Sequence, residues 1–244
     1  MTAARRRLLV LASTYPRWAG DHEPGFVHEL AKRLAGRFEV TVLCPHAAGA
    51  LRRERLDGVD VVRYRYAPDR LEKLVNDGGI TSNLARQRWM VLLVPCFVAM
   101  QLWALWRLLP RPRPDVVHAH WIFPQGLLVA GLGVVGIRTP PLVVTSHGAD
   151  LFAFRSAPMR ALKRFVLRRS DAVTVVSEGM RNAVHDLAGD AMRGLPVHVQ
   201  PMGVDLAERF RAGGAKQRSP AGFLFVGRLV EKKGLAVLLE AFAI

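Results

Sequence analysis

The sequence predicts an α/β protein whose core is a mostly parallel, doubly wound sheet of the Rossmann-like type. Two observations lead to this prediction. Short apolar runs, typical of strands buried on both faces, alternate with segments of helical periodicity along most of the 244 residues. Polar side chains directly follow several of these runs, as they do at the carboxyl ends of strands in open α/β sheets, where ligands bind.

The first βαβ unit lies at the N-terminus. Leu8–Ala12 is a continuous apolar run that predicts a strand, Phe26–Leu34 has helical spacing, and Val40–Cys44 predicts the second strand. The loop before the helix contains Gly20 and Gly25. The N–H groups at a helix start suit a phosphate, although turn geometry alone would also explain both glycines. The loop matches neither the dinucleotide fingerprint nor the P-loop.

The alternation continues through the rest of the chain. Further apolar runs predict strands at Val59–Tyr64, Val116–His118, Leu142–Thr145, Ala172–Val176 and Pro196–Gln200. Helical spacing predicts helices over Pro124–Val135, Pro158–Leu167 and about residues 179–187, the last with Ser177 as its N-cap. A polar segment, residues 207–220, then predicts a linker. After it, Gly222–Val226 and Leu235–Ala243 predict a new strand and a new helix.

Trp89–Trp106 stands out because it runs for 18 residues without a charge. It just reaches the length of a transmembrane helix and has tryptophan at both ends. A span would put strands of one sheet on opposite sides of a membrane, so we expect a buried or membrane-surface helix instead. The following Arg107, Arg111 and Arg113 could contact anionic headgroups or belong to a solvated linker.

The composition favours anionic partners. Lysine and arginine exceed aspartate and glutamate, 35 to 20, for a net charge of +15. Because no RNA-binding motif or zinc-finger spacing is present, we expect an anionic membrane surface or a phosphorylated ligand and no nucleic acid. Cys44 and Cys96 are expected to pack as small hydrophobic residues, and no signal peptide is recognisable. The predicted location is cytoplasmic, with peripheral contact to the inner face of the cell membrane.

Candidate site residues follow two of the predicted strands. His147 and Asp150 come after Leu142–Thr145, while His118 and His120 end the preceding strand. An imidazole and a carboxylate there could bind sugar hydroxyls or phosphate, or could simply cap the strand ends. The three histidines could also form a metal site, but their spacing matches no known zinc motif, and a Ser-His-Asp hydrolase lacks its G-x-S-x-G elbow.

Two basic residues near the end of the sequence form a further candidate site. Arg228 and Lys233 lie between the strand and the helix predicted there. They suit a diphosphate, or equally a basic surface turn.

Six blocks, taken in order, resemble the GT-B glycosyltransferases of the family 4 type, which transfer sugars from nucleotide donors with retention. The blocks are Thr14–Pro16 with Gly20 and Gly25–Val27, Asp115–Trp121, Ser146–Asp150, Asp171–Ser177, Pro201–Asp205 with Phe210, and Phe225–Leu229 with Lys233 and Gly234. The resemblance implies that residues 1–205 form the acceptor-side domain, residues 206–220 a linker, and residues 221–244 the incomplete start of the donor-binding domain.

The resemblance also implies roles for individual residues. His147 falls on the histidine that contacts the transferred sugar, with His118, His120 and Asp150 as further candidates for the sugar or acceptor site. Gly20 and Gly25 fall near the donor diphosphate. Arg228 and Lys233 fall on the basic pair that neutralises this diphosphate. No metal or other cofactor is expected, since the nucleotide sugar is a substrate, and the acceptor would be a polysaccharide or a lipid-linked glycan.

Two departures from the family pattern bear on activity. The first loop has separated Gly20 and Gly25 in place of adjacent glycines, and the paired-glutamate segment that holds the donor is absent. We therefore expect that these 244 residues alone do not transfer sugar. The alternative function is that of a non-catalytic Rossmann-like module that binds a membrane or a partner.

Overall fold

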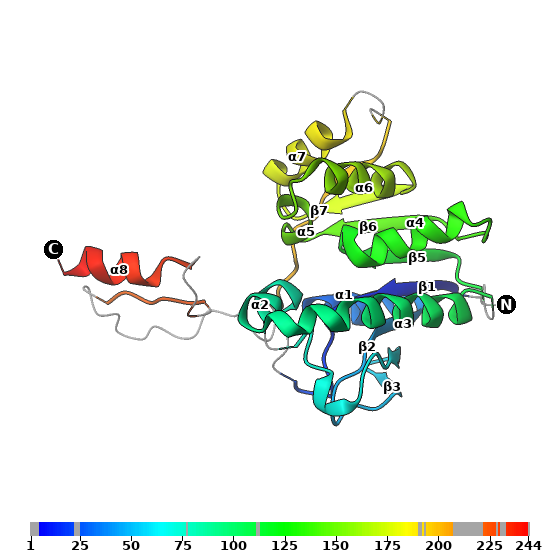
Figure 1. Cartoon of the computed structure of the whole chain (residues 1–244), viewed down its shortest axis with the longest axis horizontal. Helices are drawn as coiled ribbons and strands as arrows, with labels where there is room; N and C mark the ends of the chain where they lie inside the picture. Colours follow the sequence, from blue (N-terminus) through cyan, green and yellow to red (C-terminus); the bar gives the residue numbers. More distant parts are fainter. Residues whose placement is uncertain are drawn as a thin grey trace. The chain divides into compact units, whose positions relative to one another are not determined.

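The computed structural model describes residues 5–21, 25–76, 78–110, 113–189, 192, 194–206, 222–227, 229 and 233–243. The chain divides into two units, residues 1–203 and residues 204–244. Figure 1 traces both, coloured along the sequence.

An eight-stranded sheet is the centre of the first unit. Its strands are β1 (Arg6–Leu11), β2 (Phe38–Pro45), β3 (Arg53–Leu56), β4 (Val59–Tyr64), β5 (Val116–His120), β6 (Leu142–Ser146), β7 (Ala172–Val175) and β8 (Val197–Val199). The strand order is β3-β4-β2-β1-β5-β6-β7-β8, and all neighbouring pairs are parallel except β3 and β4. The predicted fold class, a mostly parallel α/β sheet, is confirmed.

Helices connect most of the parallel strands. They are α1 (Phe26–Leu34), α2 (Ile80–Arg86), α3 (Leu93–Leu108), α4 (Leu127–Val134), α5 (Ala149–Phe152), α6 (Ala157–Arg168), α7 (Glu178–Ala188) and, in the second unit, α8 (Leu235–Phe242). Shorter helical turns within the described residues are η1 (Asp69–Leu71), η2 (Arg88–Leu92) and η3 (Ile122–Gly126). The hydroxyl of Ser177 accepts a hydrogen bond from the Met180 amide and caps α7, as predicted.

The core has two parts, one on each face of the sheet. Along β1 the side chains alternate, so that Leu8 and Val10 belong to one cluster and Leu9 and Leu11 to the other. The first cluster contains side chains from α1, and the second contains side chains from α3, α4, α6 and α7. Because buried side chains cover both faces, the strands read as continuous apolar runs in the sequence.

The segment Trp89–Trp106 forms η2 and most of α3, and it lies over the sheet (Figure 1). One face of α3 is buried and packs against the side of the sheet formed by β2 and β4. The buried residues of this face are Leu93, Phe97, Gln101, Ala104 and Leu105. The strands on either side of this segment, β4 and β5, lie in the same sheet. The helix therefore rests on the protein core.

Three details differ from the sequence-based expectations. Strand β3 was not predicted, and it pairs with β4 through the two-residue turn Asp57–Gly58, where both φ angles are positive (48° and 82°). Residues 222–226 form no strand, because no partner strand pairs with them in the described part of the chain. Cys96 is exposed on α3, whereas Cys44 is buried as expected and burial raises the pKa of its thiol to about 12.

The predicted linker, residues 207–220, lies outside the described residues. The domain boundaries at residues 205 and 221 stay predictions. Within the second unit, the ring of Phe223 packs edge-on against that of Phe242 in α8, with 4.5 Å between the ring centroids.

Candidate active site

The carboxyl ends of β5 and β6 lie side by side and present the predicted histidines. The register pairs His118 with Val143 and His120 with Thr145. Immediately after β5, the Trp121 amide donates to the Thr145 carbonyl at 2.7 Å, which holds the two strand ends together. His147 follows β6 by one residue and thus comes next to His120. The parallel register explains why residues 27 positions apart in sequence meet.

Aromatic rings surround the His147 imidazole on several sides. The His120 ring stacks on it with 5.2 Å between centroids and an interplanar angle of 6°. The rings of Phe26 and Trp121 lie at 4.9 Å and 5.0 Å. Phe26 is the first residue of α1, so the start of this helix is adjacent to His147. The site therefore combines the ends of two strands with the N-terminus of one helix.

The histidines are held in the neutral form. Burial lowers the pKa values of His147 and His118 to about 4, and the pKa of His120 falls well below its ordinary value for the same reason. His120 Nδ1 and His147 Nε2 share a hydrogen bond of 3.0 Å, and His118 Nε2 bonds Thr145 Oγ1 at 2.6 Å. No described residue hydrogen-bonds Nδ1 of His147, so this atom can contact a substrate.

Asp150 lies within the same loop but faces inward. Its carboxylate is buried and accepts hydrogen bonds from the Ile122 amide at 2.7 Å and from Ser146 Oγ at 2.8 Å. Burial raises its pKa, while the hydrogen bonds act in the opposite direction. These bonds tie the loop after β6 to the segment after β5. Asp150 thus positions the loop that carries His147, and its contact with sugar stays a prediction.

The two predicted loop glycines occupy different positions in the first loop. Gly25 is the N-cap residue of α1 and gives it no side-chain cap, so amides of the first turn are available to an anion. Gly20 has φ = +78° in a turn beside the ion pair of Arg17 and Asp21, whose closest approach is 2.7 Å. The structure thus brings the Gly25 end of the loop to His147, through Phe26.

The two basic candidates near the end of the sequence belong to the second unit, whereas His147 belongs to the first. Arg228 lies outside the described residues, and Lys233 belongs to the second unit. Their roles at the diphosphate stay predictions.

Among the described residues, the ring nitrogens of the three histidines are not grouped closely enough to share a metal ion. His120 and His147 bond to each other, and His118 bonds to Thr145. Another group within the described residues could share a cation, namely His46, Asp69 and Glu72. Its groups already pair with each other and with Arg65, and His46 Nε2 also bonds the Ala50 carbonyl oxygen at 2.9 Å.

Comparison with known proteins identifies the family of the chain. The family model of Glycosyltransferase Family 4 matches residues 26–208, which is more than half of the chain and includes β5, β6 and His147. This chain belongs to glycosyltransferase family 4.

Several curated relatives match part of the family 4 chain. Glycogen synthase of Mycobacterium tuberculosis is 28% identical over 131 residues, which is 50% of this chain and 30% of that protein. N-acetyl-alpha-D-glucosaminyl L-malate synthase of Bacillus anthracis is 33% identical over 79 residues, 32% of this chain and 20% of that protein. The matched stretch therefore spans less than a third of the length of either relative.

Solved structures share the fold of this family 4 chain. Sucrose-phosphate synthase from Thermosynechococcus elongatus aligns over 82% of this chain and 91% of its own, with a TM-score of 0.53 and 13% identity. An alpha,alpha-trehalose-phosphate synthase (UDP-forming) from Burkholderia vietnamiensis aligns over 83% of this chain and 48% of its own, with a TM-score of 0.52 and 14% identity. At such low identity these likenesses show the fold alone, which is the GT-B fold.

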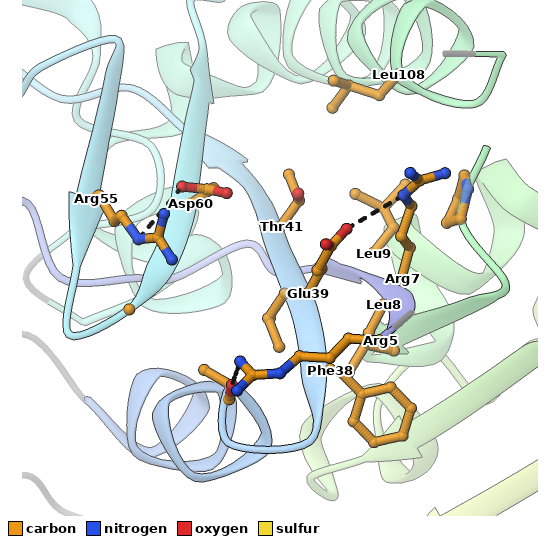
Figure 2. A pocket seen from close by; sticks show the side chains of 14 residues that line it. Arg5, Arg7, Leu8, Leu9, Phe38, Glu39, Thr41, Arg55, Asp60 and Leu108 are labelled. Carbon is orange, nitrogen blue, oxygen red and sulfur yellow. Dashed lines mark hydrogen bonds and ion pairs between the residues drawn. The ribbon is translucent and has the colours of Figure 1, made fainter. Parts of the chain in front are cut away.

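Two cavities in the family 4 chain lie at opposite ends of the parallel strands. The larger, about 450 Å³, lies at the amino ends of β1, β2 and β4; Figure 2 shows the pair Arg7 and Glu39 and the pair Arg55 and Asp60 around it. The smaller, about 330 Å³, lies beyond the carboxyl ends of β2 and β4 and is lined in part by Arg17, Lys73 and Arg86. The smaller cavity and His147 both lie at the carboxyl ends of the parallel strands, which is where open α/β sheets bind ligands.

Sequence reasoning missed the side chains that enclose the imidazole. Phe26 follows Gly25 directly, and Trp121 follows the His118–His120 segment, but neither spacing predicts a ring contact with His147. Trp121 also has an unusual φ of +79°, which turns the chain into η3 and has no signature in the sequence. Only the adjacency of these residues to the motifs could have suggested them.

Proposed function

We propose that this chain is part of a retaining glycosyltransferase that moves a sugar from a nucleotide-sugar donor to a polysaccharide or lipid-linked acceptor. The observation that carries the proposal is the neutral, ring-enclosed His147 at the carboxyl edge of the sheet, beside the start of α1. Membership of family 4 and the names of the relatives, which are sugar-transferring synthases, support the reaction class. Retention rests on the family resemblance.

His147 would contact the transferred sugar through the ring nitrogen that the protein leaves unbonded. A neutral imidazole can donate to, or accept from, a sugar hydroxyl without placing a charge near the sugar. The hydrogen bond to His120 holds the ring orientation, and the neighbouring rings exclude water from its faces. Exclusion of water strengthens each remaining polar contact with the donor.

The departing diphosphate needs fixed positive partners, because negative charge develops on it as the sugar leaves. The uncapped first turn of α1, beside Gly25, offers amide groups on the same side as His147. Gly20 leaves room in the same loop, since no heavy atom lies within 4 Å of a Cβ built there. Arg228 and Lys233 are proposed as the cations that neutralise the diphosphate.

The acceptor is proposed to use the smaller cavity, beyond β2 and β4. Three basic side chains and two carboxylates line it, so it can bind several hydroxyl groups or an acidic group of a glycan. Asn83 belongs to its wall, and the Asn83 amide donates to three backbone carbonyls at 2.7–3.1 Å, which fixes the loop of residues 73–76 around the cavity. The remaining candidates, His118, His120 and Asp150, do not line this cavity and would instead help to hold the sugar and acceptor site in place.

Nucleoside diphosphate release is the direct test. The full-length protein would be incubated with UDP-glucose, UDP-N-acetylglucosamine, ADP-glucose and GDP-mannose, with and without extracts of glycan and lipid acceptors. We expect turnover with one donor and its loss, by about a hundredfold or more, in His147→Ala. His198→Ala, an exposed histidine on β8, is the matched control. Wild-type turnover by His147→Ala would refute the role given to this residue.

Turnover should also be unchanged by a chelator, because no metal is proposed to act. A strong loss of activity in EDTA, restored by a divalent cation, would contradict that part of the proposal. Vesicle binding without turnover of any donor would instead favour the alternative function, a non-catalytic membrane-binding or partner-binding module. The proposed location is cytoplasmic, at the inner face of the cell membrane.

A further inference from the structure

A band of apolar side chains lies exposed along η2 and α3. By length and composition, residues 88–108 could cross a membrane, yet only 33% of their most apolar 18-residue window is buried. Of the eleven large apolar side chains described as exposed in residues 1–203, five lie between Trp89 and Trp106. Unburied apolar surface is thus concentrated on one continuous segment, η2 and α3, as at an interaction site.

The exposed face of α3 is as apolar as its buried face. The outer stripe consists of Leu92, Cys96, Ala99, Trp103 and Trp106, all of them exposed. Their spacings alternate between four and three residues, so they form a single line along the helix, about 20 Å long. A helix on the surface of a soluble domain normally carries polar side chains on this side. Contact with an apolar environment would therefore stabilise the outer stripe.

The charges around the outer stripe indicate the chemistry of its partner. Residues 78–114 contain five arginines and no aspartate or glutamate. Arg88 precedes the stripe and Arg107 ends it, and the Arg107 guanidinium lies 5.0 Å from the centroid of the Trp103 ring. Tryptophan and arginine together suit the headgroup region of a bilayer, where the ring is half-buried and the cation meets lipid phosphate.

We propose that the outer stripe docks on an anionic lipid bilayer, with α3 lying in the plane of the interface. The inner face of the helix excludes a transmembrane position. The Phe97 ring packs against the rings of Tyr64 and Tyr66 at 5.6 Å and 5.2 Å, and Leu105 is fully buried. A helix that spanned the membrane would leave these core side chains without partners. Docking needs no such rearrangement.

This inference deepens the proposed function by favouring a lipid-linked acceptor. The smaller cavity is lined by Met90 of η2 and by Arg86 and Gln87 just before it. An acceptor headgroup in that cavity would therefore sit at one end of the outer stripe, with its lipid in the bilayer. The choice of acceptor rests on the proposed function, whereas docking of the stripe does not.

Vesicle binding by the full-length protein tests the docking without any sugar nucleotide. We expect co-sedimentation with vesicles of phosphatidylcholine containing 30 mol% phosphatidylglycerol at 50 mM NaCl, and much weaker binding to pure phosphatidylcholine or at 500 mM NaCl. Arg88→Gln combined with Arg107→Gln should lower binding at low salt by about thirtyfold. Trp103→Ser combined with Trp106→Ser should lower it by at least about tenfold.

The matched control replaces exposed apolar side chains elsewhere. Val134 and Val135, at the end of α4, are 57% and 71% exposed. Val134→Ser combined with Val135→Ser should bind vesicles like the wild type. Quenching of wild-type tryptophan fluorescence by lipids brominated on the acyl chains needs no mutation, and it should occur if Trp103 and Trp106 enter the interface.

Besides a failure to bind vesicles, four results would overturn the docking proposal. The first two are unchanged vesicle binding of the tryptophan double variant, and vesicle binding without fluorescence quenching by brominated lipid. The third is membrane-bound protein that detergent releases but carbonate does not. The fourth is a dimer, detected by light scattering, that the tryptophan substitutions dissociate. The third would indicate a span and the fourth a second copy on the stripe. Sugar transfer to a soluble acceptor without vesicle binding would overturn the docking and leave the proposed function intact.

Discussion

The buried histidines make the stability of the first unit depend on pH in a way that can be calculated. Burial lowers the pKa of His147 from 6.5 to about 4. The folded state therefore binds fewer protons than the unfolded state when the pH is between these values. The stabilisation is complete above about pH 6.5 and is lost as the pH falls toward 4. Between pH 7.5 and pH 5.0, the loss from this single group is about 2 kcal/mol.

The perturbation that isolates this effect is His147→Gln, which removes the titrating ring. Urea unfolding followed by far-ultraviolet circular dichroism at pH 7.5, 6.0 and 5.0 would give the free energy of unfolding. We expect the wild type to lose about 2 kcal/mol more than His147→Gln over this range. His198→Gln, in which an exposed ring on β8 is removed, should keep the wild-type dependence.

Titrating groups that do not interact with His147 contribute equally to both proteins and cancel in the difference, whereas the pKa values of His118 and His120 are lowered in part by His147. His118 acts in the same direction as His147, because burial also lowers its pKa to about 4. Asp150 acts in the opposite direction, because burial raises the pKa of its carboxyl group, so that protonation favours the folded state. Equal slopes for wild type and His147→Gln would refute the conclusion that the folded protein keeps this imidazole neutral.

Three further substitutions and one control test the packing and hydrogen bonding around the site, each by the change in the free energy of unfolding. Gly126→Ala should destabilise by about 1–3 kcal/mol, because its Cβ would lie 2.9 Å from Val166 Cγ1, whereas Gly131→Ala in α4 meets nothing within 4 Å and should stabilise by about 0.5–1 kcal/mol. Equal effects would contradict this. Gly148→Ala should cost about 1–3 kcal/mol, since its φ is +103°; a neutral result would show that the loop relaxes. Asp150→Asn should cost about 1–3 kcal/mol by turning an amide N–H₂ toward donors, and an unchanged midpoint would remove its positioning role.

The regular part of the fold could be predicted because the central parallel strands are covered on both faces. Leu8–Ala12 and Leu142–Thr145 are short, apolar and separated by helical segments, and burial on both faces leaves no alternation to confuse the pattern. Strand β3 (Arg53–Leu56) escaped prediction because it lies at the edge of the sheet and none of its side chains is fully buried. The Asp57–Gly58 turn was the available signal.

The position of the candidate site could also be predicted, but its internal bonding could not. The motifs at His118–His120 and His147 end adjacent strands, and parallel pairing brings such ends together. The strand register and the turn after each strand decide which nitrogen of each histidine ring is hydrogen-bonded. The motif residues predict neither the register nor the turn. Asp150 illustrates the limit, because its spacing from His147 suited a sugar contact while its hydrogen bonds point into the loop.

The apolar segment Trp89–Trp106 shows what hydrophobicity alone does not resolve. The segment contains no charged residue on any face of the helix. Neither its hydrophobic periodicity nor its length therefore distinguishes a core helix from a membrane-surface helix. The structure shows that one helix has both characters, with Phe97 and Gln101 against the sheet and Trp103 and Trp106 exposed. A core helix needs only the first face to be apolar, and the proposed docking on a bilayer accounts for the second.

Burial of the His147 ring has a consequence for chemistry as well as for stability. With its ordinary pKa of 6.5, an exposed imidazole would be partly protonated near neutral pH, and under the proposed function it would then attract the donor diphosphate toward the sugar position. With a pKa of about 4 the ring stays neutral, so positive charge is left to the start of α1 and to the proposed Arg228 and Lys233. Under the proposed function, the neutral ring beside Phe26 and Trp121 would contact the sugar, and other groups would contact the diphosphate.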